Sequence, residues 1–317
     1  MAEEIADGKF REMREIEMKK INLYLITLCL FGCVACTDED KVGDVGTLPQ
    51  DYVLPQGESP ADDRIVEYYN SYKSYILYEY TQPDFIYGLS QTNNSYIYEK
   101  VDPLCMDVVL DFLEDIWFDL YLTEFHAKYM PYKIMVAKSM ETTYGTRTYA
   151  TMGNDGQSFY VNDCSEELKN LSAEEKRAKK NELQLCLWDY WRTKGTLEFP
   201  EEFYKVSDYT QAAKDYDPEN PDDPDFALAR GFMPMWFAYQ NKYIFDWCLY
   251  VNYQTKLVDS EQDLQHFMYA MITRTASEWG DYLTKYPLLK RKYDILHSWF
   301  LTKYKVDLKK IGEIMYN

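Results

Sequence analysis

The chain has 317 residues and a formal net charge of −19, from 53 acidic and 34 basic residues. A protein this acidic repels nucleic acid and anionic membrane surfaces, which excludes nucleic-acid binding and a purely electrostatic hold on a membrane. Its hydrophobic content of 46% is enough for a packed core, and its length allows one large domain or two small ones.

The N-terminal region carries a predicted export signal. Lys19 and Lys20 precede the apolar run INLYLITLCLFGCVA, which ends directly before Cys36. A basic segment followed by a short apolar stretch is typical of a signal peptide, and this stretch is too short for a comfortable membrane span. The small residues before Cys36 resemble the bacterial lipoprotein box, in which the cysteine is acylated and becomes the mature N-terminus. Cys33 is the alternative lipidation site.

The residues around this signal extend the interpretation. The acidic segment 37–40 resembles the surface-export signal of Bacteroidetes lipoproteins, so we expect a lipid anchor in the outer membrane, at the cell surface or on the periplasmic face. Residues 1–17 are too acidic for a signal peptide, which makes Met18 the expected start. We therefore divide the chain into 1–36 (N-terminal extension and signal peptide), 37–60 (flexible acidic tether) and 61–317 (one domain).

Apolar periodicity predicts the elements of that domain in chain order. The first half should contain helices over 61–76, 105–125 and 167–194, the last with a Ser-x-x-Glu capping box at Ser172. Strands are predicted over 75–80 and 132–137, with Gln82-Pro83-Asp84 as a break, and two short strands should flank the turn at 153–156.

A hydrophilic break at 215–225 precedes the second half. Its aspartates could surround a calcium ion, but its three prolines favour a solvated linker. Helices are predicted over 260–275, 287–304 and 307–315. The fold class is mainly α with a small β-sheet (α+β).

Four cysteines lie outside the export signal. They are widely spaced and form no Cys-x-x-Cys pair, so we interpret them as buried thiols in preference to disulfides or zinc ligands. These residues are Cys105, Cys164, Cys186 and Cys248.

Short segments along the chain resemble a family of Bacteroidetes lipoproteins, the substrate import-associated zinc metallohydrolases, also called zinc-binding metallopeptidases. The segments are Ile76-Leu77-Tyr78 with Asp84 downstream, Pro200-Glu201-Glu202-Phe203, Gly231-Phe232, Gln262-Asp263-Leu264, Glu278-Trp279 and Tyr304-Lys305-Val306-Asp307-Leu308. The resemblance extends over 60–317. It implies a metallopeptidase-like domain, a zinc cofactor and association with TonB-dependent nutrient import.

The family's His-Glu-x-x-His motif is absent from this sequence. Two histidines at i and i+4 lie on one helical face and bind zinc, while the glutamate activates a water molecule. The matching window is 187–191 or 188–192, and neither contains a histidine. The family's downstream carboxylate ligand falls near His266. His126 and His297 are the other histidines and neither forms an i, i+4 pair with it, so we predict that the zinc site is lost and that His266 is a metal candidate with no second histidine at helical ligand spacing.

That window contains Trp188, Tyr190 and Trp191 around Asp189. One interpretation is an aromatic helix packed in the core. The other is a binding platform that stacks a sugar ring or grips a peptide. Both interpretations stay open, and no catalytic residue is predicted.

The leading hypothesis is a membrane-anchored lipoprotein whose metallopeptidase-like domain is degenerate and non-catalytic. It would be an accessory or binding component of glycan or peptide uptake beside a TonB-dependent transporter. One alternative is an active zinc-dependent metallohydrolase that uses His266 and nearby acids as an atypical metal site. The other is a structural partner of an outer-membrane transporter, so the sequence leaves enzyme status open.

Overall fold

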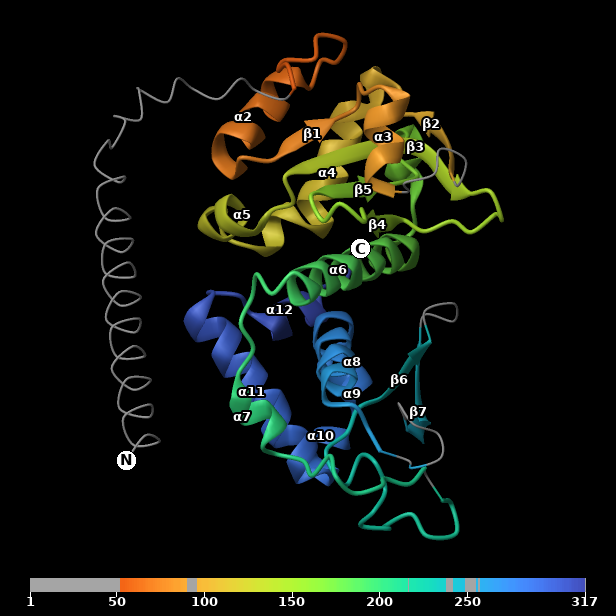
Figure 1. The fold of residues 1–317 in the computed structure, drawn as a ribbon, viewed down its shortest axis with the longest axis vertical. Coiled ribbons are helices and arrows are strands. Elements are labelled where there is room, and N and C mark those ends of the chain that lie inside the picture. The colour runs from red at the N-terminus through yellow and green to blue at the C-terminus, as the bar shows by residue number, and fades with distance from the viewer. Residues whose placement is uncertain are drawn as a thin grey trace, which may run out of the picture. The chain divides into compact units, whose positions relative to one another are not determined.

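The structure is a computed structural model that describes residues 52–89, 96–215, 217–237, 242–248, 255 and 257–316, with only the backbone described over 234–248. These residues form a mainly helical fold with a small sheet, which confirms the predicted α+β class (Figure 1). Cys36, Cys33 and residues 37–51 of the predicted tether lie outside the described residues. Within them, no helix combines the length and apolar character needed to cross a membrane.

A five-stranded mixed sheet organises the first half of the domain. Strand β3 pairs in parallel with β1 and β5 and, along its second half, antiparallel with β2, while β4 pairs antiparallel with β5. The strands are β1 (Tyr75–Leu77), β2 (Tyr96–Lys100), β3 (Lys133–Thr142), β4 (Ala150–Met152) and β5 (Ser158–Val161).

Both faces of this sheet are covered. Alternate β3 residues point to opposite faces, so Ile134 and Val136 join the large core while Met135 and Ala137 join a smaller aromatic cluster. Helices α2 (Asp62–Tyr72), α4 (Met106–Ile116) and α5 (Thr123–Tyr129) contribute to the large core, and α3 (Gln82–Leu89) contributes to the smaller cluster. Burial on both faces explains the continuous apolar run over 134–137 in β3.

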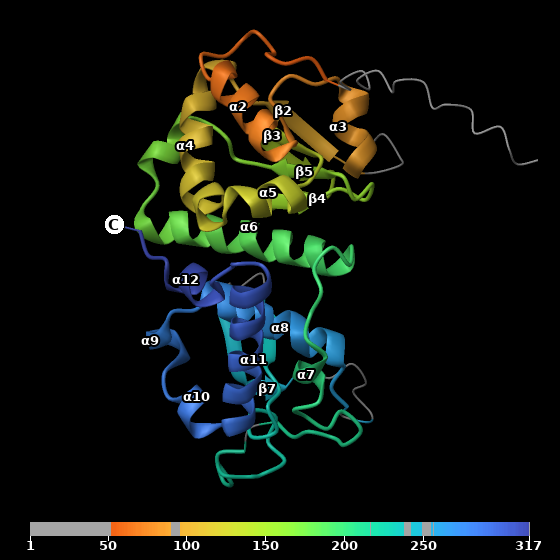
Figure 2. The same cartoon turned by 90° about the vertical axis from the view of Figure 1, so that its left-hand side faces the viewer.

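Helix α6 (Ala173–Thr193) lies between the sheet region and the C-terminal helices in both views (Figure 1, Figure 2). Its capping box is present: the N–H of Glu175 donates to Ser172 Oγ, and the N–H of Ser172 donates to Glu175 Oε2 at 2.8 Å. The side chains of Ser172 and Glu175 cap the N-terminus of the helix. The helix therefore begins at Ala173 and not at 167 as predicted. Glu166–Asn170 forms a separate 3-10 turn.

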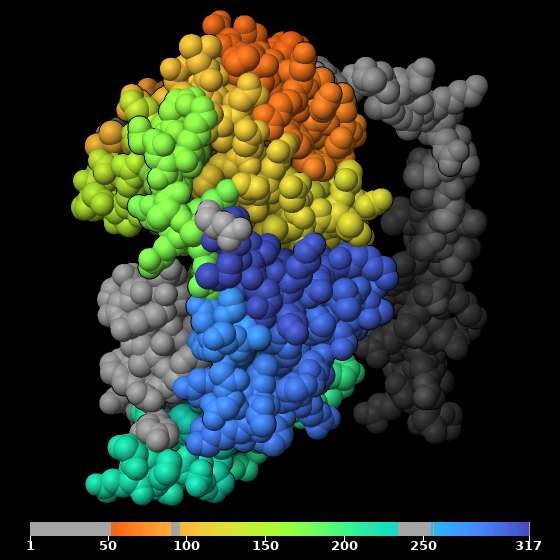
Figure 3. Space-filling view, turned by 180° about the vertical axis from the view of Figure 1, so that it is seen from behind, coloured from red at the N-terminus to blue at the C-terminus, as the bar shows by residue number. Residues whose placement is uncertain are grey.

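The described part of the second half contains helices and a two-stranded antiparallel sheet, with turns and loops over 205–215 and 217–233. Its elements are α7 (Glu201–Tyr204), β6 (Pro234–Phe237), β7 (Lys242–Cys248), α8 (Ser260–Thr273), α9 (Ala276–Trp279), α10 (Tyr282–Lys285), α11 (Pro287–Lys303) and α12 (Leu308–Glu313). Seen from behind, the C-terminal helices (blue) lie against the segment of α4 and α5 (yellow) (Figure 3). The rings of Tyr129 and Tyr304 meet at this boundary, with centroids 5.8 Å apart.

Most predicted helices and strands are present, and the differences at two helices have local causes. The helix predicted over 105–125 divides into α4 and α5, because Trp117 leaves helical geometry at φ −141°. Helix α3 forms where the sequence predicts a break at Gln82-Pro83-Asp84, because proline fits the first turn of a helix. The strands β2, β6 and β7 were not predicted.

The compact unit begins at Tyr52, earlier than the predicted boundary at 61. Gln56 Oε1 accepts hydrogen bonds from the backbone N–H groups of Tyr78 at 3.2 Å and Glu79 at 2.9 Å. The N–H of Gly57 donates to the carboxylate of Asp62 at 2.6 Å. The last part of the predicted tether is therefore packed on the domain.

The cysteines outside the export signal are described at three positions. Cys105 and Cys164 are buried, Cys186 is partly buried, and all three are free thiols. This agrees with the predicted buried thiols, while the side chain of Cys248 lies outside the described residues.

Polar side chains of α6 bind the ends of two neighbouring helices. Gln184 Nε2 donates to the carbonyl of Ile116, at the end of α4, and Lys180 Nζ donates to the carbonyl of Ile272, near the end of α8, each at 2.8 Å. The last carbonyl groups of a helix lack intrahelical partners and form the negative end of its dipole. Helix α6 therefore satisfies groups that burial would otherwise leave unpaired.

Lys180 generates a pH prediction, because it is fully buried and its burial lowers its pKa to about 7. Arg177 also lowers this pKa, whereas Glu278 raises it. Between about pH 7 and the ordinary lysine value, the unfolded chain binds a proton that the folded chain has released, so the free energy of unfolding rises with pH in this window.

We expect Lys180→Met to remove this rise. The difference in unfolding free energy between wild type and variant should grow in favour of the wild type by up to about 1.4 kcal/mol per pH unit above pH 7. Urea denaturation of both proteins at pH 7, 8 and 9 measures it. A difference that stays constant with pH would contradict the buried, deprotonating lysine.

Candidate functional site

The two indoles of the aromatic window lie in the core of the domain. Trp188 is 1% exposed and Trp191 is 0% exposed. Trp188 Nε1 donates to Tyr121 Oη at 3.0 Å, and Trp191 Nε1 donates to the carbonyl of Tyr129 at 2.7 Å. In this conformation neither ring presents a face to an external ligand, so the packing interpretation describes both tryptophans.

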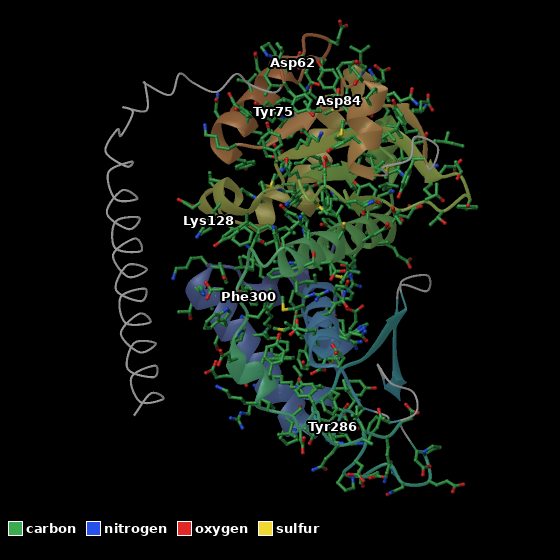
Figure 4. The ribbon with its side chains drawn as sticks, in the orientation of Figure 1. Asp62, Tyr75, Asp84, Lys128, Tyr286 and Phe300 are labelled. Carbon is green, nitrogen blue, oxygen red and sulfur yellow. The ribbon has the colours of Figure 1, made fainter. Side chains whose placement is uncertain are left out.

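These indoles connect the two halves of the domain. The ring of Trp188 meets Trp191 edge-on, with centroids 5.2 Å apart, and meets Phe300 of α11 at 5.0 Å. Phe300 and Tyr286 mark the two ends of α11 in Figure 4. Tyr190, the third candidate of the window, is 9% exposed and belongs to the same core, and burial raises the pKa of its phenol.

Asp189 faces helix α8 instead and is the polar centre of the window. Its carboxylate accepts hydrogen bonds from Gln265 Nε2 at 2.7 Å and from Tyr269 Oη, and it pairs with Arg192 at 3.3 Å. Burial, followed by the charge of Asp189, raises the pKa of Tyr269. A carboxylate with three protein partners is stabilised in place as part of the α6–α8 contact.

His266 lies beside this cluster on α8. The centroid of its ring is 5.9 Å from that of Tyr269. Burial lowers the pKa of His266 to about 4, against the charges of Asp263 and Asp189, so the imidazole is neutral at pH 7. A neutral imidazole is the form that binds metals. In the part of the chain that the structure describes, however, no three His, Cys, Asp or Glu side chains converge in a way that could hold a metal ion.

The other histidines have partners elsewhere. His126 of α5 is buried, its Nε2 lies 2.9 Å from the carbonyl of Phe118, and burial lowers its pKa to about 4. His297 lies on α11, and its Nε2 is 3.1 Å from Asp307 Oδ1. The three imidazoles therefore sit on three different helices.

Asp263, three residues before His266 on α8, forms a buried ion pair. Lys292 Nζ is 2.5 Å from Asp263 Oδ2, and both side chains are 0% exposed. Tyr209 Oη donates to the same carboxylate oxygen at 2.8 Å, and the N–H of Met233 donates to Oδ1 at 3.0 Å. The side chain of Asp263 is thus turned into the core, towards Lys292, and takes no part in a site with His266.

A groove of about 540 Å³ lies between the end of β3 and the start of α6. Its lining includes Lys138, Arg147, Asp163, Ser165, Leu168 and Lys179. Asp163 links two of the cations, since Arg147 Nε donates to Oδ1 at 2.8 Å and Lys179 Nζ to Oδ2 at 2.7 Å.

Two further features fix this arrangement. Burial works to raise the pKa of Asp163, but the hydrogen bonds from Lys179 and Arg147 bring it below its ordinary value, so the residue is a carboxylate at neutral pH. Lys179 Nζ also lies 4.3 Å from the centre of the Tyr149 ring, a favourable cation–π distance.

Sequence reasoning missed this groove because its residues come from separate segments. Lys138, Arg147, Asp163 and Lys179 are brought together only when the β-sheet forms. The buried lysine of α6 had a local signal, since Lys180 precedes Leu183 and Leu187 by three and seven residues, the spacing of one helical face.

The aromatic window generates a stability prediction. Trp188→Ala should lower the free energy of unfolding by about 3–5 kcal/mol, because it removes a large ring and leaves a cavity between the two halves. Tyr144→Ala is the matched control, since Tyr144 is 96% exposed and its loss should change stability by no more than about 0.5 kcal/mol. Chemical denaturation measures both, and equal effects would show that Trp188 is not a core residue.

Comparison with known proteins gives one similar structure. No family model matches the sequence, and no curated protein matches it. Among solved structures, the chain is similar to the 2.10 Å crystal structure of a "putative zinc-binding metallo-peptidase" from Bacteroides caccae ATCC 43185, with 15% identity and a TM-score of 0.44. The match covers 79% of this chain and 88% of that chain. At this identity and TM-score, the similarity says nothing about which chemistry this chain performs.

Proposed function

We propose that this protein is a lipid-anchored, non-catalytic binding component of a nutrient-uptake system. Acylation of Cys36 would attach it to the outer membrane, at the cell surface or on the periplasmic face. Its ligand would be a glycan or a peptide, and its partner a TonB-dependent transporter. The non-catalytic assignment rests on one observation: in the 187–192 window, the side chains of Trp188, Asp189 and Trp191 bind other residues of the same domain.

The argument rests on what a hydrolytic zinc ion needs. A catalytic site provides three protein ligands and keeps one position open for water. In the window, Trp188 and Trp191 fill the core, and the carboxylate of Asp189 is engaged by Arg192, Gln265 and Tyr269. Ligation by Asp189 would break those contacts, and His266 is the one imidazole beside it.

A binding role has support of its own. The groove next to α6 has the size of a small-ligand site and carries charged and hydroxyl groups along its lining. The strong negative charge of the chain makes polyanions unfavourable partners and leaves small ligands as the better candidates.

Zinc content tests the non-catalytic assignment. The full chain, incubated with zinc and then freed of excess metal, should hold well below one zinc ion per molecule and should hydrolyse no peptide. His266→Ala should leave the zinc content unchanged, as should His297→Ala, its matched control. One zinc per chain that disappears only in His266→Ala would establish the atypical metallohydrolase instead.

The lipid anchor is tested by fatty-acid labelling in a bacterial host that processes lipoproteins. Label should enter the wild-type chain and the Cys33→Ala variant but not Cys36→Ala, because acylation requires the thiol at the cleavage site. Label that is lost in Cys33→Ala and retained in Cys36→Ala would move the anchor to Cys33.

A further inference from the structure

We propose that the groove between β3 and α6 binds the carboxylate of a small, singly charged ligand. The inference rests on the proposed binding function and names the chemical class of the ligand. It is independent of the lipid anchor.

The charge of the lining favours an anion. Three cations face the groove, Lys138 from β3, Arg147 from the loop before β4, and Lys179 from α6. They outnumber the two lining carboxylates, Asp163 and Glu167. The lining therefore carries one more positive than negative charge, whereas the whole chain has a net charge of −19.

Two of these cations are placed to meet a ligand. The Lys138–Glu99 pair is exposed, with side chains 49% and 59% accessible, and such pairs are weak in water. Lys138 can therefore exchange Glu99 for a ligand. Arg147 is 47% exposed, and its hydrogen bonds to Asp163 use Nε and one terminal nitrogen. The second terminal nitrogen can donate to a ligand acceptor in the groove.

The third cation, Lys179, is preorganised. Lys179 is only 18% exposed and is fixed between the carboxylate of Asp163 and the ring of Tyr149. Asp163 itself adopts a left-handed backbone conformation with φ 59°, and its N–H donates to Asn162 Oδ1 at 2.8 Å. A preorganised charge loses little conformational freedom when a ligand arrives, which favours affinity.

The same features select against other ligand classes. None of the described lining residues is aromatic, so the stacking surface that recognises a neutral sugar ring is missing from that lining. A polyanion would extend beyond the groove into the negative field of the protein, whereas a single carboxylate stays within about 8 Å of the cations, the screening length at physiological salt. The volume of about 540 Å³ suits a disaccharide or a dipeptide.

Calorimetry on the full chain tests the proposal with two matched pairs of probes. One pair is an aldobiouronic acid, a disaccharide with a single uronic carboxylate, and its methyl ester, and the other is the dipeptide N-acetyl-Ala-Ala and its C-terminal amide. In at least one pair, the carboxylate form should bind about tenfold or more tightly than the neutralised form, the loss that follows removal of a charge-assisted hydrogen bond. The pair that shows this preference identifies a sugar acid or a peptide terminus as the source of the carboxylate.

Substitutions place the binding in the groove. Arg147→Gln and Lys138→Gln should each weaken the preferred carboxylate about tenfold, and Arg147→Lys should weaken it less, because the charge remains. Lys169→Gln is the matched control: Lys169 is an exposed lysine that pairs with Glu166 at 2.5 Å outside the groove lining, and its loss should change affinity less than twofold. Circular dichroism verifies that each variant is folded.

Equal binding of the carboxylate and neutralised forms, no binding of either carboxylate, or full affinity in both folded groove variants would overturn the proposal. These results are separable from the proposed function. A zinc-free, inert protein that binds a neutral glycan elsewhere would keep the binding role and reject this ligand class. A zinc-dependent hydrolase would reject the non-catalytic role whatever the groove binds.

Discussion

The burial of helix α6 between the sheet and the C-terminal helices is the constraint on which the rest of the structure depends. Its indole at Trp188 hydrogen-bonds to Tyr121 in the first half and packs on Phe300 in the second. Its amide at Gln184 and its amine at Lys180 bind the carbonyl ends of α4 and α8. The buried face of α6 contains Lys180, Asn181, Leu183, Gln184, Leu187, Trp188, Tyr190 and Trp191, and the residues of its first two turns, 173–179, are exposed or partly exposed.

This constraint bears directly on function. A His-Glu-x-x-His zinc site would need two imidazoles and a carboxylate on this helix, facing an open position. Here the same window presents two indoles to the core and one carboxylate to α8. The side chains of this window hold the two halves of the domain together and are not available to a substrate. We therefore assign ligand binding to the groove at the start of α6.

Local signals allowed much of the fold to be predicted, and non-local pairing accounts for most of what was missed. The capping box at Ser172 and the strands around the 153–156 turn follow from residues close together in sequence. Strand β2 depends on pairing with a distant β3, and its alternation of half-exposed residues gave no apolar run. The candidate site shows the same contrast between local and non-local information. The absence of the zinc motif can be read from the sequence. The burial of Trp188 depends on Tyr121 and Phe300, which are distant in the sequence.

Hydrogen exchange of the backbone amides of 181–192 tests most directly whether α6 is the enclosed centre of the domain. If it is, these amides should exchange only through global unfolding, more slowly than those of the exposed 143–148 loop, and added zinc should leave their rates unchanged. Exchange of this segment within seconds, or protection that appears only when zinc is added, would contradict the account and would place an open, metal-responsive site where we describe a packed core.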